Sequence, residues 1–321
     1  MNKCYFGFDT SCYTTSFAVC DSEGNILLNE KKMLNVKEGE RGLRQSDAVF
    51  QHTVNMEYIS AAVARFMRER SDMTLAAVGC SSRPRDIEGS YMPCFLAGVA
   101  AAKNVSAVAG SDYYSFSHQA GHVSAALYGS GATDLFEKEF VAFHVSGGTT
   151  DILRVVGREG GNLEAEHIGG TRDLNAGQVI DRAGVMMGLP FPAGKHLESN
   201  STNNLAKVPK YKPCADGLEC NLSGIENKAE KLFSETNDVP LTSAFVLNAV
   251  FDSLKVLTNN VLDRYPGTPI VYSGGVMSCR MIKDGLAGDD RYFAPPEYSS
   301  DNAAGIAYLT MKKHKYERSG G

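Results

Sequence analysis

Two histidines four residues apart are the side chains of this sequence best placed for metal chemistry. His118 and His122 lie in the stretch SHQAGH, residues 117–122. On a helix, a spacing of four brings two side chains to one face, where two neutral imidazoles can bind one divalent ion. Asp301, in an acidic turn far downstream, is the candidate third ligand. An isolated pair with this spacing is more often an ordinary helical pair, so the metal interpretation depends on the other motifs of the chain.

Three turns, two of them glycine-rich, could bind an anion through their backbone amides. Each turn follows a short β-rich run, and the turns lie at residues 9–15, 146–150 and 273–277. Glycine allows the main chain to approach a phosphate closely. The histidine pair and the turns together favour a metal that holds a phosphorylated ligand.

The composition is that of an ordinary soluble globular protein. Of the 321 residues, 43% are hydrophobic and 21% are charged. The first residues show no signal-peptide pattern, and no run approaches the roughly 18 apolar residues of a membrane span. We therefore expect a cytoplasmic protein that does not associate with membranes. The net charge of −5 argues against a freestanding nucleic-acid binder, although it leaves room for a local basic face.

The cysteines do not form a recognisable metal or redox motif. None of the eight has C-x-x-C spacing, which argues against a zinc ribbon. We expect most of them to be reduced thiols, several in the core. Cys12 and Cys279 lie inside glycine motifs and are the expected exceptions.

The hydrophobic pattern predicts two α/β lobes. Apolar residues at helical spacing predict helices at residues 51–70, 91–103, 118–128, 175–188, 241–263 and 302–313. Apolar and β-branched runs predict strands at residues 5–9, 14–20, 26–28, 74–80, 105–108, 140–145, 151–156 and 269–272. Residues 194–218 have loop composition. Because hairpins followed by a strand and a helix occur twice, we expect a first lobe of residues 1–106 and 300–321, a second lobe of residues 107–299, and a ligand cleft between them.

Seven short motifs, in the same order along the chain, resemble those of the TsaD family. Members of this family are the catalytic subunits that make threonylcarbamoyladenosine in tRNA, and they were once described as O-sialoglycoprotein endopeptidases. One glycine motif is weak evidence, but seven in order over nearly the whole chain are very specific. The matching segments are residues 7–16 (opening hairpin), 118–122 (H-x-x-G-H), 145–150 (V-S-G-G-H-T), 180–182 with 188–194 (F-D-K and G-L-x-Y-P-G-G), 222–225 (F-S-G-L), 273–276 (G-G-V-A-x-N) and 300–304 (T-D-N-A-A).

The resemblance implies an α/β protein with the two-lobed actin-like ATPase (ASKHA) fold. It implies that His118, His122 and Asp301 bind one divalent metal, iron or zinc. An adenine nucleotide or adenylate would be the second ligand, with its phosphates at that metal and at the amides of residues 146–148. Asp9 and Ser11 in the opening hairpin are then the candidate catalytic residues. The candidate nucleotide-binding residues are His144, Val145, Ser146, Gly147, Gly148, Asp181, Gly194, Gly274, Gly275 and Cys279.

Three of the acidic residues also have ordinary structural interpretations. Asp301 could cap the helix that follows it, or could cap and ligate through different oxygens. Asp181 could be a solvated residue on a helix face, and Asp9 could be a turn residue. At the level of the sequence these alternatives stay open.

The sequence departs from the family pattern at positions expected near the reaction centre. Tyr13 and Thr14 replace two adjacent acids of the family's opening hairpin, so no general base can come from there. Arg83 and Arg85 are additions in a segment that is G-P-G in the family, and guanidinium groups bind carboxylates and phosphates well. Three further family residues are replaced, by Thr149, Ala193 and Cys279. This pattern fits a divergent member that retains the metal set.

The resemblance makes threonylcarbamoyl transfer from its adenylate to adenosine in tRNA the leading functional hypothesis. The expected partners are tRNA and the partner protein subunits of the threonylcarbamoyl system. One alternative is a carbamoyl or acyl transferase that acts on another acceptor. Another is a non-catalytic, nucleotide-binding regulatory protein. A metallopeptidase is disfavoured because Gln119 stands where the H-E-x-x-H motif has its general base.

Overall fold

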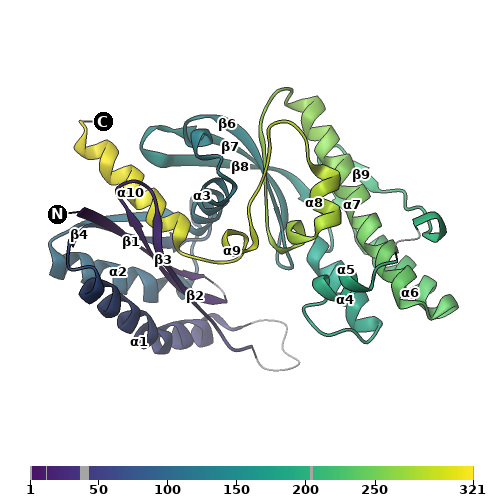
Figure 1. Cartoon of the computed structure of the whole chain (residues 1–321), viewed down its shortest axis with the longest axis horizontal. Coiled ribbons are helices and arrows are strands. Elements are labelled where there is room, and N and C mark those ends of the chain that lie inside the picture. Colours follow the sequence, from purple (N-terminus) through teal and green to yellow (C-terminus); the bar gives the residue numbers. More distant parts are fainter. Residues whose placement is uncertain (1, 12, 37–42, 203–204, 321) are drawn as a thin grey trace. The chain divides into compact units, whose positions relative to one another are not determined.

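The computed structural model describes residues 2–11, 13–36, 43–202 and 205–320 (Figure 1). The chain packs as two compact units. Met1–Lys138, Val156–Ala165 and Tyr298–Gly321 form the first unit, and Glu139–Val155 and Glu166–Glu297 form the second. Cys12, one of the two expected exceptions among the cysteines, lies outside the described residues. The described cysteines are free thiols, and Cys279 is among the buried ones.

The first unit is built on one five-stranded sheet. Its elements are β1 (Asn2–Ser11), β2 (Thr14–Asp21), β3 (Ile26–Met33), α1 (Gln45–Glu69), β4 (Met73–Arg83), η1 (Pro93–Phe95), α2 (Leu96–Ala109), β5 (Asp112–Ser117), α3 (His118–Ser130), η2 (Thr133–Glu137), η3 (Glu159–Gly161) and α10 (Ala304–Arg318). The strand order is β3-β2-β1-β4-β5. Strands β1, β4 and β5 run parallel, and β2 joins β1 and β3 in antiparallel pairs. The three parallel strands therefore end at the same edge of the sheet.

Alternate residues of β1 face two different helical layers. Phe6 and Phe8 belong to the core under α1 and α2, and Tyr5 belongs to the core under α10. A Cβ atom at Gly7 would lie 2.4 Å from the backbone nitrogen of Ala307, so this glycine lets α10 lie directly on the sheet. As a result, α1 and α2 cover one face of the sheet, and α3 and α10 cover the other (Figure 1).

The second unit contains a larger mixed sheet. Its elements are β6 (Glu139–Val145), β7 (Thr150–Arg158), β8 (Asn162–Thr171), α4 (Ala176–Met186), α5 (Gly194–Asn200), η4 (Leu205–Lys207), β9 (Cys214–Asp216), β10 (Glu219–Asn221), α6 (Ser223–Thr236), α7 (Val239–Arg264), β11 (Ile270–Ser273), η5 (Gly275–Ser278), α8 (Arg280–Leu286) and β12 (Arg291–Phe293), and α9 (Pro296–Ser299) follows at its boundary. The strand order is β12-β11-β6-β7-β8-β10-β9. Helix α7 is long and apolar enough to span a membrane, but 67% of its most apolar window is buried inside the protein, as in the core helix of a soluble domain.

All six predicted helices are confirmed, with shifted ends, but two other local predictions are wrong. Residues 105–108 are not a strand, because they form the last turns of α2, which ends where Gly110 adopts a left-handed conformation with φ 63°. The neighbouring strand is β5, which begins two residues after that glycine. Residues 194–218 are not all loop, because they contain α5 and β9.

The first unit extends further along the chain than the sequence suggested. The expected boundary followed residue 106, whereas the packing boundary follows Lys138. The reason is that β5 is the edge strand of the first sheet and α3 packs against α10. His118, His122 and Asp301 consequently belong to the same unit.

Candidate metal centre and phosphate-binding turns

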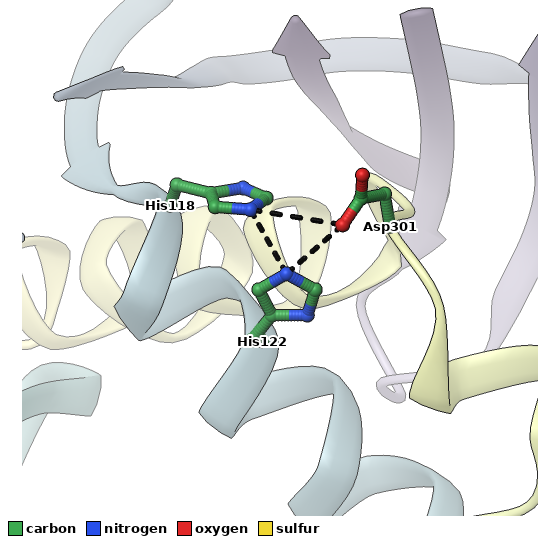
Figure 2. A group of neighbouring side chains, drawn as sticks. All are labelled: His118, His122 and Asp301. Carbon is green, nitrogen blue, oxygen red and sulfur yellow. Dashed lines mark hydrogen bonds and ion pairs between the residues drawn. The ribbon is translucent and has the colours of Figure 1, made fainter. Parts of the chain in front are cut away.

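Three potential metal ligands converge in the first unit. Figure 2 shows His118 and His122 on one helix, α3, with the carboxylate of Asp301 directed at both rings. The Nε2 atoms of the two histidines are 2.9 Å apart. Asp301 Oδ1 lies 3.1 Å from His122 Nε2 and 3.8 Å from His118 Nε2. The structure thus brings together the three residues that the sequence singled out as a metal set.

The start of α3 is capped so that both histidines project from its first turns. Ser117 has an extended backbone, and its Oγ accepts a hydrogen bond from Ala120 N at 3.1 Å, which is N-capping geometry. The hydroxyl of Ser117 in turn donates to Asp86 Oδ2. Because this cap fixes where the helix begins, it also fixes the direction of the imidazoles four residues apart.

Two glycines bring Asp301 to the histidines. A Cβ atom at Gly305, in α10, would lie 1.9 Å from the carbonyl oxygen of Gly121, in α3, so the backbones of the two helices touch. Ser124 Oγ donates to the carbonyl oxygen of Gly305 at 3.0 Å at the same crossing. Asp301 stands in the turn just before α10, so this crossing determines its distance from α3.

Asn302, the residue after Asp301, supplies a side-chain acceptor at the start of α10. The amide of Ala304, the first residue of α10, donates to Asn302 Oδ1 at 3.0 Å. Asp301 Oδ1 instead faces the histidine pair. Of the alternatives left open by the sequence, this geometry favours the ligand over the cap.

The donor set fits a divalent transition metal. Metal–ligand bonds of about 2.0–2.1 Å at tetrahedral angles place neighbouring ligand atoms about 3.3 Å apart. The three observed separations, from 2.9 to 3.8 Å, lie on both sides of that spacing. The side chains of His118, His122 and Asp301 are 22%, 17% and 27% exposed, so the group is partly open to solvent. Two imidazoles and one carboxylate leave coordination positions for other ligands, as in catalytic rather than structural sites.

The two residues predicted to be catalytic are both buried, and one of them, Asp9, contacts this group. Asp9 is 1% exposed and accepts a hydrogen bond from His118 Nδ1 at 3.2 Å. Ser11 is also 1% exposed, and among the described residues its hydroxyl has no hydrogen-bond partner. Ser81, which the sequence did not single out, donates its hydroxyl hydrogen to Asp9 Oδ1. No sequence signal marks Ser81, because it reaches Asp9 only through the pairing of β1 with β4.

A buried histidine of α1 supports the opening hairpin from the other face of the sheet. His52, in α1, is fully buried, and its Nδ1 lies 2.8 Å from Thr15 Oγ1. Asn55 Nδ2 donates to the same hydroxyl at 3.1 Å. Burial lowers the pKa of His52, which keeps the ring neutral at physiological pH. The only sequence feature that points to the contact of His52 with Thr15 is the position of this histidine among the apolar, core-facing residues of α1.

In the second unit, two glycine turns follow neighbouring parallel strands. Strands β6 and β11 pair in register, with His144 opposite Ser273, and His144 Nδ1 lies 3.1 Å from Ser273 Oγ. The turn after β6 is closed by Ser146 N, which donates to Thr149 O at 2.7 Å. The turn after β11 begins at Gly274, which has φ 99° and would place a Cβ atom 2.2 Å from the carbonyl oxygen of Val145. The structure therefore brings the predicted residues of both turns to one edge of the sheet, where ligands bind in open α/β sheets.

Both turns have an open side. A Cβ atom at Gly148 or at Gly275 would meet no atom within 4 Å. The amides of Gly148 and Thr149 donate to Ser146 Oγ at 3.2 and 3.1 Å, so this hydroxyl occupies the position that a phosphate oxygen could take. Helix α4 begins directly beside the first turn, because Gly177 N donates to Ser146 O at 3.1 Å.

Asp181 and its neighbours line the same region of the second unit. Asp181 Oδ1 accepts from the backbone amide of Ala193 at 2.7 Å, which ties α4 to the start of α5 at Gly194. Burial raises the pKa of Asp181, and the hydrogen bond from Ala193 opposes that rise. The carboxylate is therefore half-buried and paired, which disfavours a solvated face residue. Cys279 follows the second turn, and burial raises the pKa of its thiol.

Comparison with known protein families shows the family to which this chain belongs. The model described as "TsaD: tRNA N6-adenosine threonylcarbamoyltransferase" matches residues 51–308. The chain belongs to the TsaD family. A tRNA N6-adenosine threonylcarbamoyltransferase of Streptococcus pneumoniae (strain Taiwan19F-14) is 28% identical over 98% of this chain and 93% of its own length.

Solved structures show the fold of this TsaD-family chain. Full-length HypF in a phosphate- and nucleotide-bound form matches with a TM-score of 0.60 at 13% identity, covering 98% of this chain and 55% of HypF. Component A of (R)-2-hydroxyglutaryl-CoA dehydratase from Acidaminococcus fermentans matches with a TM-score of 0.53 at 14% identity, covering 97% and 99% of the two chains. The chain has the two-lobed actin-like ATPase fold that the sequence predicted.

The departures from the TsaD pattern now have structural positions. Tyr13 stands at the tip of the β1–β2 hairpin, 42% exposed, and its carbonyl oxygen accepts from Leu34 N. Thr14 is buried in β2. Arg83 donates to Asp86 and Ser82, so its guanidinium braces the loop after β4, and Asp86 of this loop also accepts from Ser117, the N-cap of α3. The added arginine at position 83 therefore has a local partner within its own loop.

We expect Gly177→Ala to disrupt the first turn of the second unit. The new Cβ atom would lie 2.6 Å from Gly147 N and 2.7 Å from the carbonyl carbon of Ser146, so the turn must move. Loss of one amide–phosphate hydrogen bond should weaken adenine-nucleotide binding by about tenfold or more, as measured by calorimetry. Gly224→Ala, in α6, is the matched control, because its nearest atom is 3.6 Å away. Unchanged nucleotide affinity in Gly177→Ala would remove this turn from the nucleotide site.

Proposed function

We propose that the chain transfers the threonylcarbamoyl group of threonylcarbamoyl-adenylate to the N6 amine of adenosine in tRNA. The observation that carries this proposal is the convergence of His118, His122 and Asp301 in a chain of the TsaD family. A regulatory protein without catalysis would not require such a donor set. The curated relatives, named as tRNA N6-adenosine threonylcarbamoyltransferases, are matched over nearly their whole length.

The residues of the first unit hold the metal. His118 and His122 would hold a divalent ion through Nε2, and Asp301 through Oδ1. A bound divalent ion supplies Lewis-acid polarisation of a carbonyl or phosphoryl oxygen. A set of two histidines and one carboxylate suits iron(II) and zinc, which are the proposed metals.

The residues of the second unit hold the adenylate. The turn at residues 146–148 presents amides beside the N-terminus of α4, where the helix dipole favours a phosphate. The amides of Gly148 and Thr149 now donate to the hydroxyl of Ser146. An oxygen of the bound phosphate would take the place of this hydroxyl as their acceptor. Asp181 has one oxygen committed to Ala193 N, and its second oxygen, which faces Gly147, can accept from a ribose hydroxyl. We assign the Gly274–Gly275 turn to the same nucleotide.

The partners and the compartment follow from the same activity. The net charge of −5 is unfavourable for binding tRNA by the chain alone, so partner protein subunits would share the contact with the nucleic acid. We place the protein in the cytoplasm, where its tRNA substrate is found, and assign it no membrane role.

A second transferase activity is favoured by one specific observation. The hairpin beside the metal group carries the exposed Tyr13 and the buried Thr14 in place of the family's two acids. This change alters the surface that an acceptor would meet, and it supports carbamoyl or acyl transfer to another acceptor as the alternative. A non-catalytic nucleotide-binding role has the same support but leaves the complete metal set unexplained.

A transfer assay separates these functions. The purified chain is mixed with the partner proteins of a threonylcarbamoyl system, adenylate made from labelled threonine, and unmodified tRNA. We expect label in the tRNA, and threonylcarbamoyladenosine after digestion to nucleosides. Consumption of the adenylate that does not depend on tRNA would support another acceptor. Tight nucleotide binding without consumption would support the regulatory role.

A further inference from the structure

We propose that Asp9 is a positioning residue that holds His118 in the tautomer needed for metal binding, and that it does not touch the substrate. This inference rests on the proposed function only in taking His118, His122 and Asp301 as the ligands. It replaces the catalytic role that the sequence suggested for Asp9.

The two ring nitrogens of His118 have separate contacts. Nδ1 lies 3.2 Å from each carboxylate oxygen of Asp9, with hydrogen-bond geometry toward Oδ1. Nε2 faces His122 Nε2 at 2.9 Å and Asp301 Oδ1 at 3.8 Å. The ring thus bridges a buried carboxylate on one side and the candidate metal position on the other.

This arrangement selects one tautomer. An ionised carboxylate has no hydrogen to donate, so the hydrogen between Asp9 and His118 must be carried by Nδ1. In a neutral imidazole the other nitrogen then has a free lone pair, and that nitrogen is Nε2, the atom directed at the metal position. A carboxylate behind a ligating histidine also raises the basicity of the ligand.

The carboxylate of Asp9 is itself held in place. Ser81 donates its hydroxyl hydrogen to Oδ1, so this oxygen is shared between Ser81 and His118. Asp9 lies near the end of β1, Ser81 near the end of β4, and His118 directly after β5. These are three adjacent parallel strands, so the order β1-β4-β5 builds the chain of contacts. A local register shift between Ser81 and Arg83 in the β4–β5 pair lies at the same place.

Burial excludes direct contact with a large substrate. Asp9 is 1% exposed, and its second oxygen accepts no hydrogen bond from the described residues. A general base must come within hydrogen-bond reach of the proton that it removes. A carboxylate enclosed behind His118 reaches the ring and not an adenosine of tRNA, so its effect on the reaction passes through the ligand.

The test measures metal binding by the full chain without tRNA or nucleotide. Affinity for Zn²⁺ and Co²⁺ is determined by competition with a chelator for the unmutated protein, Asp9→Ala, Asp9→Asn and Ser81→Ala. Loss of a carboxylate behind a metal-binding histidine weakens metal affinity by about 10- to 100-fold, so we expect this range for Asp9→Ala. Asp9→Asn keeps an acceptor and should lose less, and Ser81→Ala should lose least.

The control is Asp21→Asn, which changes another buried carboxylate of the same sheet. Asp21 accepts from Glu23 N, Asn25 N and Asn25 Nδ2 in the β2–β3 turn, and within the described part of the chain these partners are separate from the candidate ligands. The metal affinity of the Asp21→Asn variant should equal that of the unmutated protein. A fall as large as that of Asp9→Asn would show a general effect of removing a buried charge, and would overturn the inference.

A spectroscopic readout separates positioning from mere structural support. Nitrogen-15 NMR of the imidazoles should show His118 protonated at Nδ1 in the unmutated protein, and protonated increasingly at Nε2 in Asp9→Ala. Protonation at Nε2 in the unmutated protein would overturn the inference, even if Asp9→Ala does not fold. Unchanged metal affinity in Asp9→Ala, with transfer activity lost, would assign Asp9 to the substrate. If the unmutated protein binds neither cation, the metal site fails, and the tautomer measurement still decides the role of Asp9.

Discussion

Replacing His118 and His122 together by alanine is expected to abolish metal binding and to lower threonylcarbamoyl transfer by about a thousandfold or more. Only Asp301 would remain of the three converging ligands, and a single carboxylate with 27% exposure cannot hold a transition-metal ion. A metal that polarises a reacting oxygen contributes several kcal/mol to transition-state stabilisation, which corresponds to about three powers of ten in rate. Bound metal is measured by elemental analysis, and transfer by labelled threonine in tRNA.

His167→Ala is the control for this experiment. His167 also pairs with an aspartate, Asp151, at 3.3 Å, but it is 46% exposed and lies in the second unit. The His167→Ala variant should retain both bound metal and transfer activity. If the double variant held no metal but transferred as well as the unmutated protein, the metal would have no part in the reaction. If the unmutated protein itself held no metal, the site would have been misidentified.

Gly305→Ala is expected to cost about 3 kcal/mol of unfolding free energy and to weaken metal binding at the same time. The added Cβ atom would lie 1.9 Å from Gly121 O and 2.7 Å from Ala125 N, so α3 and α10 must move apart. Overpacking of a close contact typically costs 1–3 kcal/mol, and occasionally more. His122 follows Gly121 directly, and Asp301 lies just before α10, so the same movement separates two ligands. Urea unfolding measures the stability, and chelator competition the affinity.

Gly224→Ala serves again as the matched change in a helical glycine. Its Cβ atom would meet nothing closer than 3.6 Å, so it should leave both properties intact and add a little stability through helix propensity. Stability lost in Gly305→Ala with metal affinity retained would mean that the ligands do not depend on this crossing. Retention of both properties would show that the helices tolerate a wider separation.

The metal ligands could be predicted from the sequence because two of them follow a local rule. His118 and His122 are four residues apart on a helix, and that spacing alone places them on one face. Asp301 could be proposed only through the order of the family motifs, since nothing local links it to α3. What brings it there is the contact of Gly305 with Gly121, and a pair of small residues far apart in the chain carries no visible signal.

The residues around the metal ligands were harder to predict, because their contacts also join segments that are far apart in the sequence. Asp9 was singled out, but its partner Ser81 was not, because their contact depends on β4 being inserted next to β1 in the sheet. The false strand at residues 105–108 has a different origin. Its valines have strand propensity, but an alanine-rich helix continues through them until Gly110 ends it.

The first unit is assembled from both ends of the chain, and this has a consequence for biosynthesis. Ser124 and Gly305, which meet at the helix crossing, are 181 residues apart in sequence. While the ribosome makes the second unit, the sheet face that carries Tyr5, Gly7 and Asp9 has no α10 to cover it. The histidine pair is then already synthesised but has no carboxylate to complete it. Metal uptake should therefore be one of the last steps of maturation, and a chain that stops before Asp301 should leave the ribosome unable to load its ion.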